Sequence, residues 1–305
     1  MRSTNLWLRV CSAVGALAWL CGGGLPALAE CTLTPGPTRT VTRVIDGETL
    51  ALDDGSEVRL AGALAPRGID ASTDDASWPA AVAAKAALAA LAEGHNVVLG
   101  YAGSARTDRQ NRHVAQVFVV EHGQETWLQG RMLSEGHARA YQQKDHRGCA
   151  EELLAFEKTA RDAVRGVWAS GAYQTRPANR PRDLEGIVGN FVVLRGKVAW
   201  VAEGRQAIAL GFTPTRSGSW GGRRGVIVMI ENGDRELRGT FGGNAKALEG
   251  KSVEVRGWLE QRLGRPAGTT VIDVSLAGMI VVDGNTAQAV ATANKDGPAA
   301  ASAPP

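Results

Sequence analysis

The sequence predicts an α+β protein made of two small β-rich domains, with helices packed on the first. Three observations lead to this prediction. Short apolar strand segments alternate with turn signals along most of the chain. Helical patterns are concentrated in the first half. A stretch rich in proline and arginine, residues 173–185, reads as a linker between the two halves, and 305 residues are enough for two hydrophobic cores.

Local signals define the elements of the first half. A β-rich segment, residues 40–52, contains an Asp46-Gly47 turn, and Asp53-Asp54-Gly55 joins it to a return strand at 58–60. An alanine-rich helix is expected up to residue 93, with Ser77 as N-cap, Pro79 in the first turn and Gly94 as the stop. Its apolar positions at helical spacing are Val82, Leu88 and Leu91. The later segments are strands at 96–99 and 114–120, a polar loop at 106–112, and helices at 126–135 and 149–164.

The first 29 residues are typical of a secretory signal. Arg2 and Arg9 form a basic start, an apolar stretch follows at residues 10–20, and Ala27-Leu28-Ala29 is a cleavage pattern of small residues. We therefore expect export to the periplasm or the medium, with no stable membrane span after cleavage. A retained membrane anchor is the alternative.

Cleavage would leave two cysteines, Cys31 and Cys149. An even number of cysteines in an exported protein predicts one disulfide, whereas two free thiols are the alternative in a reducing compartment. The charge is nearly balanced, with 34 basic and 31 acidic side chains, so overall charge does not predict nucleic-acid binding. Phosphate binding would need a local cluster of cations.

One motif near the front of the expected mature chain carries the functional information. Val44-Ile45-Asp46-Gly47-Glu48-Thr49-Leu50 is followed by Arg59-Leu60-Ala61-Gly62-Ala63-Leu64-Ala65-Pro66-Arg67. The pair of segments resembles the staphylococcal-nuclease (thermonuclease) family, and Gly136-His137-Ala138 and Gly166-Val167-Trp168 match its later landmarks. The resemblance implies a five-stranded OB-type barrel with three helices over residues 30–172.

The resemblance also implies a calcium-dependent phosphodiesterase site. Asp46 matches a site-supporting acid of the turn, and Glu48 matches a metal-binding aspartate. Arg59 and Arg112 match the two arginines that clamp the phosphate during catalysis. Asn111 replaces a glycine in the turn before Arg112, and asparagine also tolerates a positive φ.

Two positions depart from the family pattern. Leu64 stands where a second metal carboxylate belongs, and Arg67 stands where the loop glutamate belongs. A calcium site needs several oxygen ligands, so we expect calcium binding to be weak or lost. Arg59, Arg67 and Arg112 together would suit a phosphate. Two other outcomes are open: an acid among Asp70, Asp74 and Asp75 completes the metal site, or Arg67 pairs with Glu48 or Asp46 and closes it.

The second half, residues 186–283, is predicted as a smaller OB-like barrel, and an SH3-like barrel is the competing prediction. The expected strands are 192–201, 206–212, 226–230, 252–259 and 271–282, with a short helix at 241–248 between the third and fourth. Residues 284–305 have the composition of a disordered tail. Trp200 and Trp258 are expected in the core. The glycine-rich loop 218–225, with Trp220, Arg223 and Arg224, is either a mobile loop or a clamp for a single strand.

Single histidines carry no prediction of a metal site. His146 lies close to Cys149 in sequence, which is far short of a zinc site, and His113 and His137 have no partner in the sequence.

Three functions follow. The first is an exported, catalytically impaired nuclease homologue that binds nucleic acid or another phosphate ligand through its arginines. The second is an active calcium-dependent nuclease that cleaves DNA or RNA with a rearranged site. The third is a structural protein of the cell envelope that contacts a protein partner through the second barrel.

Overall fold

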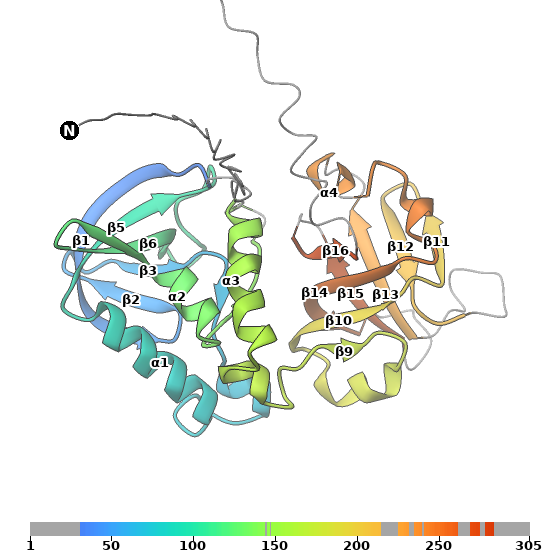
Figure 1. Ribbon diagram of the computed structural model, residues 1–305, viewed down its shortest axis with the longest axis horizontal. Helices are drawn as coiled ribbons and strands as arrows, with labels where there is room; N and C mark the ends of the chain where they lie inside the picture. The colour runs from blue at the N-terminus through green and yellow to red at the C-terminus, as the bar shows by residue number, and fades with distance from the viewer. Residues whose placement is uncertain are drawn as a thin grey trace, which may run out of the picture.

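The computed structural model describes residues 31–143, 145, 146, 148–214, 225–231, 235–239, 241–261, 269–274 and 278–283. Two sheet-rich regions lie side by side, and helix α3 (Ala150–Asp162) runs along the side of the first region that faces the second (Figure 1). The leader 1–29, the tail 284–305 and residues 218–224 of the glycine-rich loop lie outside the described residues.

Five strands of the first region form a ring in the order β3-β2-β1-β5-β6, which closes through a parallel β3–β6 pairing. The long β1 takes part twice, because its first half pairs with β5 and its second half with β2. Their bounds are β1 Thr34–Asp46, β2 Thr49–Leu52, β3 Glu57–Leu60, β5 Asn96–Tyr101 and β6 His113–Glu121. Strand β7 (Gln124–Trp127) pairs antiparallel with β6 and adds a strand to the sheet. Strand β4 (Ala63–Leu64) pairs with β8 (Arg139–Ala140).

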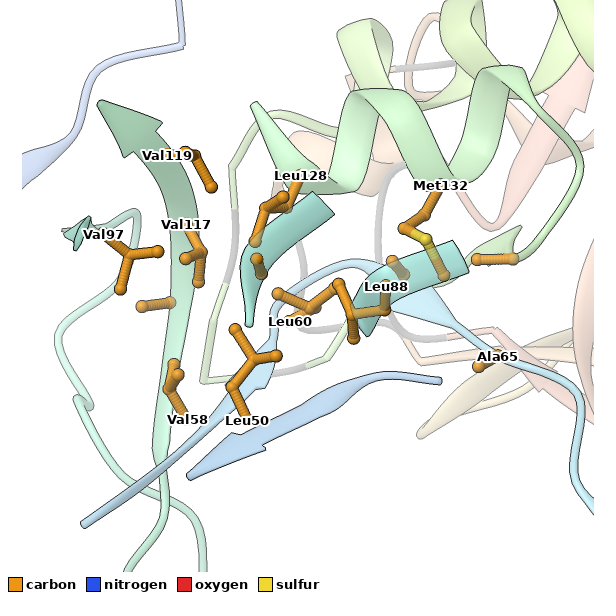
Figure 2. Close-up of a cluster of buried hydrophobic side chains, with 14 of the residues drawn as sticks. Leu50, Val58, Leu60, Ala65, Leu88, Val97, Val117, Val119, Leu128 and Met132 are labelled. Carbon is orange, nitrogen blue, oxygen red and sulfur yellow. The ribbon is translucent and has the colours of Figure 1, made fainter. Parts of the chain in front are cut away.

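The core of this region lies between the ring and its helices. Apolar side chains from alternate strand positions, such as Leu50, Val58 and Val117, meet Leu88 of helix α1 (Pro79–Ala92) and Met132 of helix α2 (Leu128–Ser134) (Figure 2). Gly94 and Gly136, at φ values of 80° and 76°, follow the ends of α1 and α2 as expected.

Two helix predictions need correction. Trp78, not Ser77, occupies the N-cap of α1, because Ser77 donates its hydroxyl to Asp74 instead. Val82 is 48% exposed, since the buried face of α1 is formed by the small residues Ala81, Ala84 and Ala92 with Leu88. The segment predicted as one helix at 126–135 begins in β7 and becomes helical only at Leu128.

The second region forms a sheet in the order β11-β12-β13-β15-β14-β10-β9, with β16 also paired to β14. The predicted strands 192–201 and 271–282 are each split in two. The bounds are β9 Arg176–Pro177, β10 Phe191–Lys197, β11 Trp200–Glu203, β12 Ala207–Gly211, β13 Gly225–Glu231, β14 Ser252–Glu260, β15 Thr269–Val274 and β16 Ile280–Val282. Between β13 and β14 lie α4 (Arg235–Gly239) and the 3₁₀ helix Ala245–Leu248.

The two regions have the same strand connectivity if β10 and β11 are taken as halves of one bent strand. Only Val198 and Ala199 separate them, and β10 pairs with β14 while β11 pairs with β12. A parallel pair, β13 with β15, occurs where the first region has β3 with β6. The assignment of the second region to the OB class stays a prediction.

The segment predicted as a linker is packed against both regions. Tyr173, Ala178 and Leu184 are buried, and β9 pairs in parallel with β10. The predicted disulfide is confirmed: Cys31 and Cys149 are bonded, with Cα atoms 4.9 Å apart and a sequence separation of 118. Among the described residues, no helix has the length and apolar character needed to cross a membrane.

Candidate nuclease-type site

The acidic turn between β1 and β2 holds the first two candidate residues. The backbone N–H of Glu48 donates a hydrogen bond of 2.9 Å to Asp46 Oδ1, so the Asp46 side chain shapes the turn. Glu48 lies in the short turn between the paired residues Asp46 and Thr49 of the β1–β2 ladder, and only 5% of the residue is exposed.

Both oxygens of the Glu48 carboxylate are already hydrogen-bonded. Arg59 Nη2 donates to Oε1 at 2.6 Å, and the backbone N–H of Ala65 donates to Oε2 at 2.9 Å. Arg59 reaches Glu48 because Thr49 and Arg59 are directly opposite each other in the β2–β3 ladder. Burial raises the pKa of Glu48, while the charges of Arg59 and Arg67 partly offset that effect. The carboxylate is thus held in an ion pair inside the domain.

This set of donors does not fit a calcium ion. Leu64, predicted from the resemblance to stand at the second metal position, is fully buried and has no side-chain oxygen. Glu48 would have to give up Arg59 and Ala65 to coordinate a metal. Within the part of the chain that the structure describes, no group of three or more histidine, cysteine, aspartate or glutamate residues is placed to hold a metal ion.

The three acids after the loop, which the sequence left open as substitutes, have other hydrogen-bond partners. Asp70 Oδ2 accepts from Tyr173 at 3.0 Å and from Arg139 Nη2 at 3.2 Å. Asp74 accepts from the backbone and hydroxyl of Ser77, and Asp75 accepts from the backbone N–H of Gly68. These bonds fix the acids within the loop and at the boundary between the two regions.

Arg67 points toward the second region and not toward an acid of the turn. Its guanidinium carbon lies 5.5 Å from the centre of the Trp258 ring on β14, a cation–π distance. Its backbone N–H donates to Asp70 Oδ2 at 3.2 Å. The ion pair that the sequence left open for Arg67 and Glu48 is instead made by Arg59 and Glu48.

Arg112 lies at the start of the same sheet and has its own carboxylate partner. It is two residues before Val114, the parallel-register partner of Arg59. Its Nη2 lies 2.7 Å from Asp108 Oδ2, and Asn111 adopts a φ of 61° in the turn between them, as expected. Burial acts to raise the pKa of Asp108, but hydrogen bonds from Arg112 hold it below its ordinary value. Arg59 and Arg112 therefore approach from neighbouring strands, each neutralised by a separate acid.

The histidines and tryptophans singled out in the sequence each have a structural partner or packing contact. His113 Nδ1 lies 2.9 Å from the Tyr101 hydroxyl, and Cys149, which follows His146, is in the disulfide. Burial lowers the pKa of His137, with Glu135 opposing that effect. Trp200 packs against Ala209, Ile227 and Val271. Trp258 is half-buried between Phe191 and Arg67.

A network of ion pairs lies between the two regions, and the sequence did not predict it. Arg256 of β14 is 2% exposed and lies 3.0 Å from Glu157 of α3 and 2.7 Å from Glu254. Arg161 of α3 makes two hydrogen bonds with Glu254, of 2.8 and 2.7 Å. A sequence signal was present: Glu254 and Arg256 are two residues apart, so they share one face of the strand, opposite the face of Val253, Val255 and Leu259.

Comparison with known proteins identifies the first region. Residues 57–170 match the model of the family described as staphylococcal nuclease homologue. The match begins after the turn that contains Asp46 and Glu48 and includes Arg59, Leu64, Arg67 and Arg112. The curated proteins include no match to this chain. The family resemblance of the first domain is therefore confirmed, and nothing in these comparisons identifies the second region.

Proposed function

Because the first region of this chain is a staphylococcal-nuclease domain, we propose that it is a nuclease homologue that has lost calcium-dependent cleavage. We propose further that it binds nucleic acid or another phosphate-bearing ligand. The observation that carries the first part is the state of the two metal positions. Both carboxylate oxygens of Glu48 already accept hydrogen bonds, from Arg59 and from the backbone N–H of Ala65, and the side chain of Leu64 is fully buried.

Electrostatics support the loss of the metal. Arg67 places a positive charge where the family has a negative one. Burial raises the pKa of Glu48, and the charge of Arg67 is among those that act to lower it, so a cation beside Glu48 would also be repelled by Arg67. Asp70, Asp74 and Asp75 do not compensate, since their oxygens accept hydrogen bonds within the loop and from Arg139 and Tyr173.

The same substitutions favour a phosphate. Arg59 and Arg112, the two arginines that match the phosphate clamp of the family, are ion-paired with Glu48 and Asp108. Arg67 adds a third guanidinium, which contacts the Trp258 ring and has no carboxylate partner among the described residues. A guanidinium matches the geometry of phosphate oxygens. Phosphate binding therefore needs no group beyond those present, whereas cleavage needs a metal or base that they do not provide.

Export is part of the proposal. The disulfide between Cys31 and Cys149 is typical of an oxidising compartment, and the leader-like pattern of residues 1–29 agrees with it. We infer that the second region is of the OB type, on the order of its strands and the parallel β13–β15 pair. It would add a second surface for a strand or for a protein partner.

Two assays with the purified, oxidised protein test the function. The first incubates single-stranded DNA and RNA with the protein in calcium or in chelator, beside a Glu48→Ala variant. We expect no cleavage in either condition. Cleavage that the chelator and Glu48→Ala both abolish would instead establish the active nuclease with a rearranged site.

The second assay measures binding of a labelled oligonucleotide by fluorescence anisotropy over a range of salt concentrations. We expect salt-sensitive binding that is weakened in Arg67→Gln/Arg112→Gln. These two positions are chosen because replacing Arg59 would leave the buried Glu48 unpaired. Binding that is the same in wild type and variant would overturn the assignment to these arginines, and no binding at all would favour the envelope protein-contact function.

A further inference from the structure

A pocket at the boundary of the two regions gathers positive charge from separate elements. Its volume is about 500 Å³, within the range of small-ligand sites. Four cations line it, one on α3, one on β9 and two on β10, together with two hydroxyl groups: Arg161, Arg176, Arg195, Lys197, Thr175 and Ser252. Among the described residues, the pocket lining contains no carboxylate.

The pairing of β9 with β10 brings these cations together. Leu194 is opposite Arg176 in the parallel ladder, and Arg195 is opposite Pro177. Arg195 and Lys197 are two residues apart on β10, so they lie on the same face of the strand. Ser252 is opposite Lys197 in the β10–β14 ladder. The sheet edge formed by β9 therefore places several donors around one space.

Two of the four cations are neutralised. Arg161 is held by two bonds to Glu254, by a 2.9 Å bond to the Thr175 hydroxyl and by the Trp168 ring 5.1 Å away. Arg195 makes an exposed ion pair of 2.7 Å with Asp283.

The other two cations lack an acidic partner. Arg176 donates to the backbone carbonyl of Gly171 at 3.1 Å, and neither Arg176 nor Lys197 is paired with a carboxylate in the described part of the chain. The pocket thus keeps a local positive charge in a protein whose overall charge is nearly balanced. A bound anion would relieve the repulsion between these neighbouring cations.

We propose that this pocket is a second anion site, separate from the nuclease-type site, and that it takes a phosphate group. Arg176 provides a fork of donors that matches phosphate oxygens, and Lys197 provides a point charge. The hydroxyls of Thr175 and Ser252 can donate to the remaining oxygens. No aromatic side chain of the described residues lines the pocket, so binding depends on the phosphate and not on the base.

The test uses three double variants that each remove two positive charges. Arg176→Gln/Lys197→Gln changes the pocket, and Arg67→Gln/Arg112→Gln changes the nuclease-type site. Lys85→Gln/Arg205→Gln is the matched control, because both residues are exposed and lie in α1 and in the β11–β12 turn. Thermal unfolding of each variant first checks that the fold is retained.

Binding is measured with two probes: a labelled thymidine oligonucleotide by anisotropy, and inorganic pyrophosphate by calorimetry. For the pocket variant, we expect the slope of log affinity against log salt to become shallower by about 1.4 with the oligonucleotide. This change corresponds to roughly 20-fold weaker binding at 0.1 M salt. The control should bind as the wild type does.

Each outcome decides the proposal. Loss of pyrophosphate binding in the pocket variant supports a site for free phosphate compounds, and loss of oligonucleotide binding alone supports a site for a strand. Unchanged binding in the pocket variant, or equal losses of affinity in the control variant, overturns the proposal that the pocket binds an anion. A loss confined to Arg67→Gln/Arg112→Gln also overturns it while supporting the proposed function. Failure of the wild type to bind either probe overturns both.

Discussion

Replacing Arg256 with methionine should destabilise the whole chain, because this buried cation joins the two regions. Its Nη1 lies 3.0 Å from Glu157 Oε2 and 3.1 Å from the Ala140 carbonyl, and its Nη2 lies 2.7 Å from Glu254 Oε1. Glu157 is 1% exposed and Arg256 is 2% exposed. Methionine fills most of the space but removes from Glu157 its nearer cationic partner, leaving Arg161 Nη1 at 3.4 Å and the backbone N–H of Ala140.

The magnitude follows from the charge that remains. Breaking a buried ion pair by removing one partner costs roughly 3–5 kcal/mol when the other charge stays buried without a partner, and the longer 3.4 Å pair of Glu157 with Arg161 offsets part of that cost here. Glu254 is affected less, because Arg161 keeps two hydrogen bonds to it. Neutralising the remaining acid in Glu157→Gln/Arg256→Met should recover about 2 kcal/mol, because no isolated charge is then buried. A loss near ~4 kcal/mol is large for a protein whose total stability is of order 5–15 kcal/mol.

Urea unfolding of the oxidised protein measures these changes, followed in parallel by tryptophan fluorescence and circular dichroism. Coincidence of the two curves checks that one transition describes both regions. Arg195→Met is the matched control, because it makes the same chemical change at an ion pair whose arginine side chain is 56% exposed. We expect the control to lose under about 1 kcal/mol. If Arg256→Met unfolds within 1 kcal/mol of the wild type, or the double variant is no more stable than the single one, the assignment of a buried ion pair is refuted.

Three further predictions concern pH, redox state and metal. Burial acts to raise the pKa of Glu254, but hydrogen bonds from Arg161 and the charge of Arg256 lower it from 4.5 to about 2, so its stabilisation is present above pH 4.5 and is lost as the pH falls toward 2. Unfolding free energies should therefore fall by about 2 kcal/mol more in the wild type than in Glu254→Gln between pH 6 and pH 3. An equal fall in both proteins would contradict this. Reducing the disulfide between Cys31 and Cys149 should cost up to ~4–5 kcal/mol on the chain-entropy model, and an unchanged urea midpoint after reduction would argue against it. Millimolar calcium should leave the thermal midpoint unchanged, whereas a bound metal at a hundred times its Kd would add ~2.7 kcal/mol.

The elements that could be read from the sequence are those whose signals are local. The Asp53-Asp54-Gly55 turn, the strands around it and the glycines after α1 and α2 lie where expected. The face of α1 could not be read, because small residues allow the helix to approach the strands closely and leave Val82 outside. The split of the predicted strand 192–201 was also hidden, since no turn signal separates the two halves and only their pairing partners differ.

The candidate site likewise has features that the sequence predicts and features that it does not. The resemblance to the family motif predicts the roles of Glu48, Arg59, Leu64 and Arg67 and the replacement of two acids, because motif positions depend only on order along the chain. The partner of each charge was not predictable. Arg59 pairs with Glu48, while Arg67 meets Trp258, a residue 191 positions later in the sequence.

The sequence by itself thus determined the nuclease-type domain and its disulfide, and it predicted the substituted metal positions, because these depend on residue identity and order along the chain. Only the tertiary structure decided how the charges are neutralised and where unpaired cations collect. Burial and distance govern those interactions, and both arise when α3, β9, β10 and β14, which are far apart along the chain, come together at one boundary.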